Sequence, residues 1–214
     1  MKYIVLAGAD GSGKSYIADV LKKKRVSVIA EPFRFTEATK LLADIALRDK
    51  TLNPLDRFNA FLSNRILGWS DIKQEGSIVS DRSYVCSITY TIADIILKQT
   101  NEPFSDDVVY ELTDKLLNVT KIHQETIPLH IDKLYLLEMS SSLMYERFKS
   151  LKGDDLMEQD INYLFLVQKI YKLVVDMLYN KGYIHSYEIV TLKDYEDAVA
   201  KSEYVSKTIL KETI

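Results

Sequence analysis

The sequence predicts one α/β domain in which a five-stranded parallel sheet is flanked by helices on both faces. Short apolar runs alternate along the chain with longer segments of helical periodicity, which is the pattern of a parallel sheet covered by helices. A glycine-rich segment directly follows the first apolar run. The 214 residues contain no internal repeat, low-complexity linker or break in composition, so we expect a single domain over residues 1–214.

Each expected element follows from its local pattern. Ser105 and Asp194 resemble helix N-caps, and Gly182 resembles a helix stop. The expected strands are 2–7, 25–30, 77–80, 133–138 and 186–191. The expected helices are 16–24, 37–48, 56–73, 84–99, 105–124, 142–151, 160–180 and 194–212. Ligands of parallel sheets bind beyond the carboxyl ends of the strands, so the residues after each strand are the candidate site residues.

Residues 8–15 read G-A-D-G-S-G-K-S and match the phosphate-binding P-loop, G-x-x-x-x-G-K-[ST], between a strand and a helix. The backbone N–H groups of such a loop surround a phosphate, and the helix N-terminus adds partial positive charge. We expect Lys14 to reach the outer phosphates of a bound nucleotide and Ser15 to hold Mg²⁺. The expected ATP contacts are Gly8, Gly11, Ser12, Gly13, Lys14 and Ser15. The fold is therefore predicted to be that of a P-loop NTPase, and the competing interpretation is a glycine-rich turn without a ligand.

Composition narrows the class of protein. A net charge of -3 argues against extensive binding of nucleic acid, which needs many Lys and Arg contacts to phosphates. The single cysteine, Cys86, excludes an internal disulfide and fits a reducing compartment, where a small buried hydrophobic role is favoured over a catalytic thiol. No apolar run approaches the roughly 18 residues of a membrane span. We expect a soluble, cytoplasmic protein without a signal peptide.

Charged residues follow two more of the expected strands. Arg34 lies in the segment E-P-F-R-F-T-E after the second strand, where its guanidinium would suit a phosphate. Asp81 and Arg82 follow the third strand, where the carboxylate can order Mg²⁺ and its water and the arginine can face the P-loop. The alternatives are a surface arginine in the first case and an ion pair between strand ends in the second.

The segment from Phe58 to Arg65 carries an aromatic and a cationic group on one helical face. Phe58, Phe61 and Arg65 recur at helical spacing, so Phe61 and Arg65 can point together into a cleft. Aromatic residues at this spacing are more often part of the core, and that interpretation stays open.

These segments occur together and in order, and the chain resembles the thymidylate kinases from residue 1 to about 180. The P-loop with Asp10 is similar to the family's G-x-D-x-x-G-K-S/T, and Pro32 to Glu37 resembles a proline followed two residues later by a phosphate-binding arginine. Residues 61–65 resemble the helix whose phenylalanine stacks on thymine and whose arginine contacts the base. Asp81-Arg82 with Ser87 and Tyr90 resembles D-R-Y-x-x-S-x-x-A-Y, and residues 160–171 resemble the helix after the lid.

The resemblance implies phosphoryl transfer from ATP with Mg²⁺ to dTMP. Lys14 and Ser15 would serve the ATP side, and Asp81 would join Ser15 at the metal. Arg34 and Arg82 would hold the acceptor phosphate, while Asp10 would contact the deoxyribose or its surroundings. The implied substrate-binding residues are Asp10, Glu31, Arg34, Phe61, Arg65, Arg82, Ser87 and Tyr90. The family also suggests a homodimer with helices such as 84–99 at the interface.

The chain departs from the family pattern at several positions. Ser83 replaces a tyrosine or histidine, and Thr91 stands where bacterial members carry a glutamine. The short lid expected at about 151–158 contains no arginine, and a nearby cation would replace it: Arg147, Lys149 or Lys152. The acceptor therefore stays open between dTMP, dUMP and a modified pyrimidine monophosphate.

Two other functions fit parts of the sequence. Deoxynucleoside kinases share Glu-Pro after the second strand and an acidic-Arg-Ser motif, which Glu31-Pro32 and Asp81-Arg82-Ser83 match. In that family the glutamate is the general base, but the family's glutamine is Asn59 here and its lid arginines are absent. A nucleotide-dependent switch is the third candidate, and it would have no use for residues that bind an acceptor.

Overall fold

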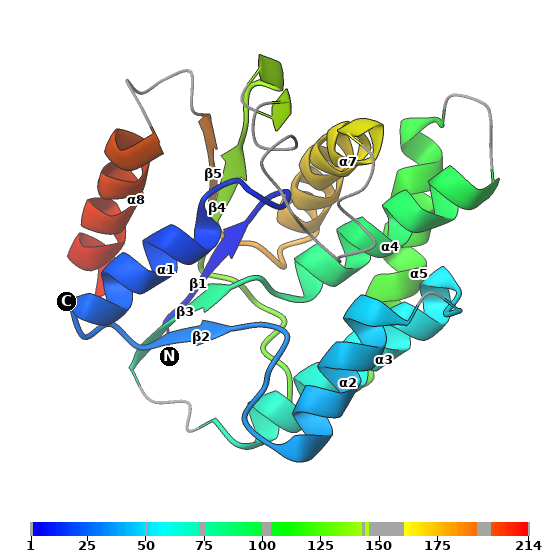
Figure 1. Ribbon diagram of the computed structural model, residues 1–214, viewed down its shortest axis with the longest axis horizontal. Coiled ribbons are helices and arrows are strands. Elements are labelled where there is room, and N and C mark those ends of the chain that lie inside the picture. Colours follow the sequence, from blue (N-terminus) through cyan, green and yellow to red (C-terminus); the bar gives the residue numbers. More distant parts are fainter. Residues whose placement is uncertain are drawn as a thin grey trace.

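The computed structural model describes residues 2–49, 51–72, 76–99, 104–142, 144–145, 161–191 and 198–213. Five parallel strands form one sheet in the order β2-β3-β1-β4-β5 (Figure 1). They are β1 (Lys2–Ala7), β2 (Val28–Ala30), β3 (Ser77–Asp81), β4 (Lys133–Glu138) and β5 (Tyr187–Thr191). The predicted five-stranded parallel sheet is confirmed.

Helices cover both faces of this sheet. The described residues form α1 (Lys14–Lys23), α2 (Glu37–Arg48), α3 (Pro54–Ser70), α4 (Tyr84–Gln99), α5 (Asp106–Lys121), α7 (Ile161–Asn180) and α8 (Ala198–Thr213). Figure 1 shows α1 and α8 side by side on one face, and they contact each other. On the other face α4 packs against α3, α5 and α7, and α2 packs on α3.

The central strand β1 explains the two hydrophobic layers. Its side chains alternate, since successive residues of a strand point to opposite faces of the sheet. Tyr3 and Val5 join the larger core beneath α3, α4, α5 and α7. Ile4 and Leu6 join the smaller core beneath α1 and α8. From Tyr3 to Ala7 every residue of β1 is apolar and buried, because both faces of the sheet are covered.

Several element boundaries differ from the prediction by a few residues, and two of these differences have a clear local cause. The second strand was expected from residue 25, but Arg25 has a left-handed φ of 64° and its N–H donates to the carbonyl of Lys22. This turn ends α1, so pairing begins only at Val28. Helix α3 begins at Pro54, ahead of the expected residue 56, because the Asn53 side chain accepts from the N–H groups of Leu55 and Asp56.

The homodimer with the helix at residues 84–99 at its interface stays a prediction. Every side chain of α4 from Tyr84 to Ile96 is buried within the chain, whereas Leu97 and Lys98 at its end are exposed. The expected lid at 151–158 with Arg147, Lys149 and Lys152, most of the helix at 142–151 and the N-cap at Asp194 lie outside the described residues.

No helix among the described residues is both long enough and apolar enough to cross a membrane.

Candidate active site

The loop between β1 and α1 curves tightly against the end of β4. Gly8 has a φ of +137°, and a Cβ placed there would lie 2.3 Å from the carbonyl oxygen of Leu137. Gly13 has a φ of +96° and directly precedes α1. Because side chains are excluded at Gly8 and strained at both positions, the loop keeps a main-chain surface at the N-terminus of α1.

Lys14 lies over this loop. Its Nζ donates to the carbonyl oxygens of Gly8 at 2.8 Å and Ala9 at 2.9 Å, and to Ser12 Oγ at 3.3 Å. Burial lowers the pKa of Lys14, and the guanidinium of Arg82 lowers it further. The ammonium group is therefore held by neutral oxygens, which a phosphate would replace with stronger, charged partners.

Ser15 and Asp81 meet beside the loop because β3 pairs with β1. Leu6 and Asp81 are partners in the parallel register, so the end of β3 lies next to the start of the P-loop. Ser15 Oγ donates to Asp81 Oδ2 at 2.9 Å. The other carboxylate oxygen, Oδ1, is buried with no hydrogen-bond partner among the described residues. The Ser15 hydroxyl and this unpartnered carboxylate oxygen are hard oxygen ligands of the kind that Mg²⁺ prefers.

Arg82, Asp10 and Tyr90 form a second cluster at the same edge of the sheet. The guanidinium of Arg82 forms an ion pair with Asp10, and its carbon lies 5.8 Å from the centre of the Tyr90 ring. The main-chain N–H of Asp10 donates to the Tyr90 hydroxyl at 3.1 Å. Burial alone would raise the pKa of Asp10, but Arg82 and Lys14 lower it below its ordinary value. Asp10 is therefore an anion that links the P-loop to Arg82.

Glu31 and Arg65 form a buried ion pair at the centre of another cluster of side chains. Glu31 Oε2 accepts from Arg65 Nε at 2.8 Å and from Arg65 Nη2 at 2.6 Å. Arg65 Nη2 also donates to Ser87 Oγ at 3.0 Å, and Trp69 Nε1 donates to Glu31 Oε1 at 3.0 Å. These residues come from the end of β2, from α3 and from α4, so the network ties three elements together.

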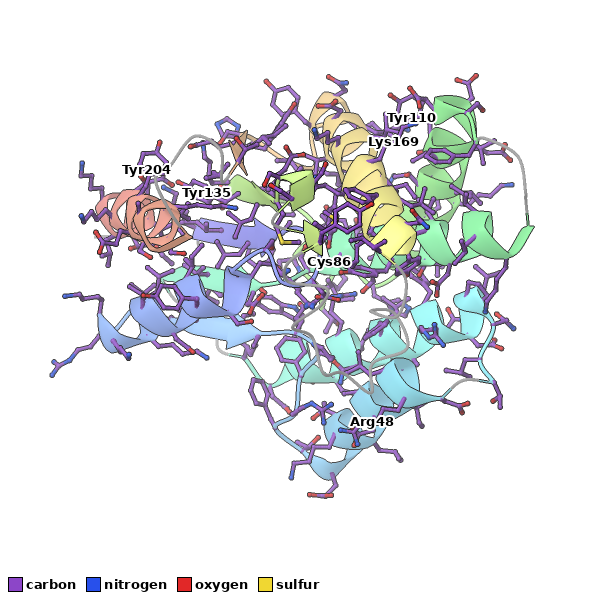
Figure 2. The ribbon with its side chains drawn as sticks, turned by 45° about the horizontal axis from the view of Figure 1, so that its top comes forward. Arg48, Cys86, Tyr110, Tyr135, Lys169 and Tyr204 are labelled. Atoms are coloured by element: carbon purple, nitrogen blue, oxygen red, sulfur yellow. The ribbon has the colours of Figure 1, made fainter. Side chains whose placement is uncertain are left out.

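A cavity of about 180 Å³ lies between the two clusters. Seven of the eight predicted substrate-binding residues, from four parts of the chain, line this cavity: Asp10, Glu31, Phe61, Arg65, Arg82, Ser87 and Tyr90. Figure 2 places Cys86, which also lines the cavity, in the interior of the molecule. The cavity therefore shares Asp10 with the P-loop that carries Lys14.

Arg34 is the predicted substrate-binding residue that lies apart. Its Nη2 is 3.0 Å from Asp44 Oδ1 on α2, in an ion pair whose two side chains are more than two-fifths exposed. It does not line the cavity, although Pro32, two positions earlier, does. The structure thus brings Arg65 and Arg82 together with Asp10 and leaves Arg34 at the surface.

Several residues near the cavity did not follow from the sequence. Counting from Asp81, the serine of the D-R-Y-x-x-S motif falls on Cys86, one position before Ser87. Burial raises the pKa of the Cys86 thiol, as expected of a small buried side chain. Trp69 was detectable, since it continues the helical spacing of Phe61 and Arg65 by four residues. Leu47 and Asn64 also line the cavity, as do Pro32 and Ser83, which the sequence motifs include without assigning them a contact.

Solved structures with this fold include thymidylate kinases and a deoxyadenosine kinase. Thymidylate kinase from Candida albicans is 20% identical, with a TM-score of 0.67 over 99% of this chain and 92% of that chain. Thymidylate kinase from Ehrlichia chaffeensis is 17% identical, with a TM-score of 0.61 over 98% of this chain and 97% of that one. Deoxyadenosine kinase from M. mycoides, solved with dCMP and dCDP, is 15% identical, with a TM-score of 0.66 over 98% and 99%.

No protein-family model matches the sequence, and no curated protein matches it either. The likeness therefore rests on structure at identities of 20% or less. Since the match spans nearly all of each chain, it establishes the architecture: the chain has the α/β fold of the P-loop kinases.

Proposed function

We propose that the chain is a nucleoside monophosphate kinase of the thymidylate kinase type, which transfers the γ-phosphoryl group of ATP to dTMP. One observation carries the proposal. The ion pair of Asp10 and Arg82 links the P-loop to a cavity that Phe61 and Arg65 also line. A phosphate donor on the loop and a nucleotide in the cavity would then meet at Arg82.

On the ATP side, the main-chain groups of the P-loop and Lys14 would hold the phosphates. Ser15 Oγ and the unpartnered Oδ1 of Asp81 are the groups that would hold Mg²⁺ or its water. A bound Mg²⁺ neutralises phosphate charge in enzymes of this class. Catalysis would rest on positioning and on neutralised charge, and no covalent intermediate on the protein is needed.

On the acceptor side, the cavity offers groups that suit a deoxynucleotide. Phe61 provides a ring for stacking on the base, and Arg65 Nη1 is buried without a hydrogen-bond partner among the described residues. Arg82 lies at the boundary with the P-loop, where the acceptor phosphate would lie. Tyr90 and Asp10 would border the sugar.

Arg34 would join the acceptor phosphate by leaving Asp44. Exposed ion pairs of this kind contribute about 0–1 kcal/mol, so releasing this one costs little. Arg34 is also on the same loop as Pro32, which lines the cavity. An anionic acceptor is the kind of ligand that would attract it.

A deoxynucleoside kinase is the second candidate, and the charges of the cavity favour it. Asp10 and Glu31 are matched by Arg65 and Arg82, so the lining carries no net charge for a phosphate. Glu31 lines the cavity after the second strand, where the deoxynucleoside kinases place their general base. A similar structure is that of a deoxyadenosine kinase.

A substrate panel separates the two candidates. Purified protein with Mg-ATP is given dTMP, dUMP, thymidine, deoxycytidine and deoxyadenosine in turn, and diphosphate and monophosphate products are quantified. We expect dTMP to give the highest kcat/KM. Faster turnover of any unphosphorylated nucleoside would replace the first candidate with the second, and turnover of none would reject both.

A further inference from the structure

Glu31 is the carboxylate whose role differs between the two candidate reactions. A nucleoside presents a 5′-hydroxyl, and a base must take its proton during transfer. A nucleoside monophosphate presents phosphate oxygens that have already lost their protons at neutral pH, since the second pKa of such a group is near 6. The hydrogen bonds of Glu31 therefore help to decide whether the residue acts as a general base.

Each oxygen of Glu31 accepts a hydrogen bond from a donor on α3. Oε2 accepts two N–H groups of Arg65, and Oε1 accepts the indole N–H of Trp69. The side chains of Glu31 and Arg65 are 3% and 4% exposed, so these bonds are shielded from bulk solvent. A base that shuttles protons would need an oxygen directed at the substrate, whereas these three bonds direct the carboxylate at α3.

Trp69 is itself held rigidly. Its ring meets Tyr3 edge-on at 5.4 Å between centroids and Phe33 edge-on at 6.1 Å. It is 2% exposed, in the larger hydrophobic core. The indole N–H is thus a fixed donor, and it restricts where the Glu31 carboxylate can lie.

The bonds to Glu31 in turn fix the position of the Arg65 guanidinium. Its Nε and Nη2 bind Glu31, and Nη2 also reaches Ser87, which leaves Nη1 without a partner among the described residues. Arg65 lines the cavity and is buried. A buried N–H group without a partner is costly, and a ligand acceptor in the cavity would satisfy it.

We propose that Glu31 is a positioning residue and not a general base: Trp69 fixes Glu31, and Glu31 fixes Arg65 so that Nη1 is offered to the bound acceptor. The inference rests on the proposed function, because it assigns the cavity to an acceptor nucleotide. It adds Trp69 to the residues that determine acceptor binding, although Trp69 does not line the cavity.

Steady-state kinetics of Glu31→Gln and Trp69→Phe with dTMP and Mg-ATP test this role. Each variant weakens the hold on Arg65, so we expect the KM for dTMP to rise about tenfold, as for a lost hydrogen bond to a charged group. We expect kcat and the KM for ATP to stay close to the wild-type values. Tyr84→Phe is the matched control, because it removes one buried donor from another aromatic ring, at the carbonyl of Leu129. It should lower the melting temperature without changing the KM for dTMP.

Two outcomes would overturn the proposal. One is a fall in the kcat of Glu31→Gln by about two to four powers of ten at an unchanged KM, which is the loss expected for a general base. The other is a KM for dTMP in Trp69→Phe that equals that of the control. If Glu31→Gln fails to fold, as judged by its melting curve, Trp69→Phe decides alone. A wild-type protein that does not phosphorylate dTMP would contradict the proposed function instead, and is recorded first.

Discussion

Arg82 has an unusual backbone conformation for its residue type. Its φ of 77° lies in the left-handed region, which few residues other than glycine adopt and which costs about 1–3 kcal/mol. Its N–H donates to the carbonyl of Leu6 at 3.0 Å, and its guanidinium pairs with Asp10. The strained residue is thus the one whose side chain pairs with the P-loop and also lines the cavity.

Replacement of Arg82 should affect turnover more than folding. We expect Arg82→Ala to lower kcat with dTMP by about three to five powers of ten, as the loss of a transition-state arginine does in other P-loop enzymes. Arg82→Lys keeps one charge but loses the planar guanidinium, so it should recover only part of the rate. Single-turnover kinetics at saturating ATP measure this, and a loss below tenfold in Arg82→Ala would remove Arg82 from the reaction.

The pair of Asp10 and Arg82 should make stability depend on pH in the acid range. The pKa of Asp10 is lowered in the folded protein, so its contribution is present above the unfolded pKa and is lost as the pH falls through the folded one. We expect the difference in unfolding free energy between wild type and Asp10→Asn to be constant from about pH 5 to 8 and to shrink below about pH 4. Urea unfolding across this range measures it, and a difference that grows in acid would contradict the assignment.

At the scale of elements, α3 fixes the loop that follows β2. Asn64 Oδ1 accepts from the N–H of Phe33 at 2.8 Å, and its Nδ2 donates to the carbonyls of Phe33 at 2.9 Å and Thr39 at 2.7 Å. One turn later, Gly68 lies under the Phe33 ring, where a Cβ would come within 2.0 Å of the ring. The Asn64 amide and the close contact at Gly68 thus hold this loop to α3, in addition to the hydrogen bonds that Arg65 and Trp69 donate to Glu31.

The contact between Gly68 and Phe33 predicts a specific coupling. We expect Gly68→Ala to destabilise the fold by about 1–3 kcal/mol, because the buried ring cannot move aside without strain. In the double variant with Phe33→Leu, the smaller side chain leaves room for the added methyl group. The double variant should therefore lose less unfolding free energy than the sum of the two single losses. Urea unfolding of the four proteins gives the coupling, and strict additivity would show that the ring is not the obstacle.

The sequence revealed the elements better than the contacts between them. Apolar runs and the P-loop sufficed for the five strands, since both signals are local. The shortened β2 depends on the turn at Arg25, which composition does not show. Phe61, Arg65 and Trp69 share a helical spacing, but the partner of Trp69 is 38 residues away. The ion pair of Arg34 could not be predicted from the sequence, because its partner, Asp44, belongs to a different element.

For the molecule as a whole, the parallel sheet brings the site together. The ends of β1 and β3 are neighbours in register, so Asp81 and the P-loop meet there. The end of β2 brings in Glu31, while α3 and α4 add Arg65, Ser87 and Tyr90. The P-loop and the cavity therefore lie at the same edge of the sheet, as ligand sites of parallel sheets do.

This layout makes the chain's single tryptophan a reporter of the cavity. Trp69, on α3, donates a hydrogen bond to Glu31 and lies in the larger core. The residues expected to bind Mg-ADP, Lys14 and Ser15, lie in the P-loop instead. We expect dTMP to change the fluorescence of Trp69 in a saturable titration, while Mg-ADP alone changes it little. A larger fluorescence response to Mg-ADP than to dTMP would contradict the assignment of dTMP to the cavity.

The central claim is that an acceptor which already carries a phosphate binds beside the P-loop at Arg82. Its most direct test is a competition in which equal concentrations of dTMP and thymidine share one reaction with Mg-ATP labelled at the γ-phosphate. The account predicts that label appears first and mainly in dTDP. Label that appears first in dTMP would show that the cavity takes the unphosphorylated nucleoside, and would contradict the account.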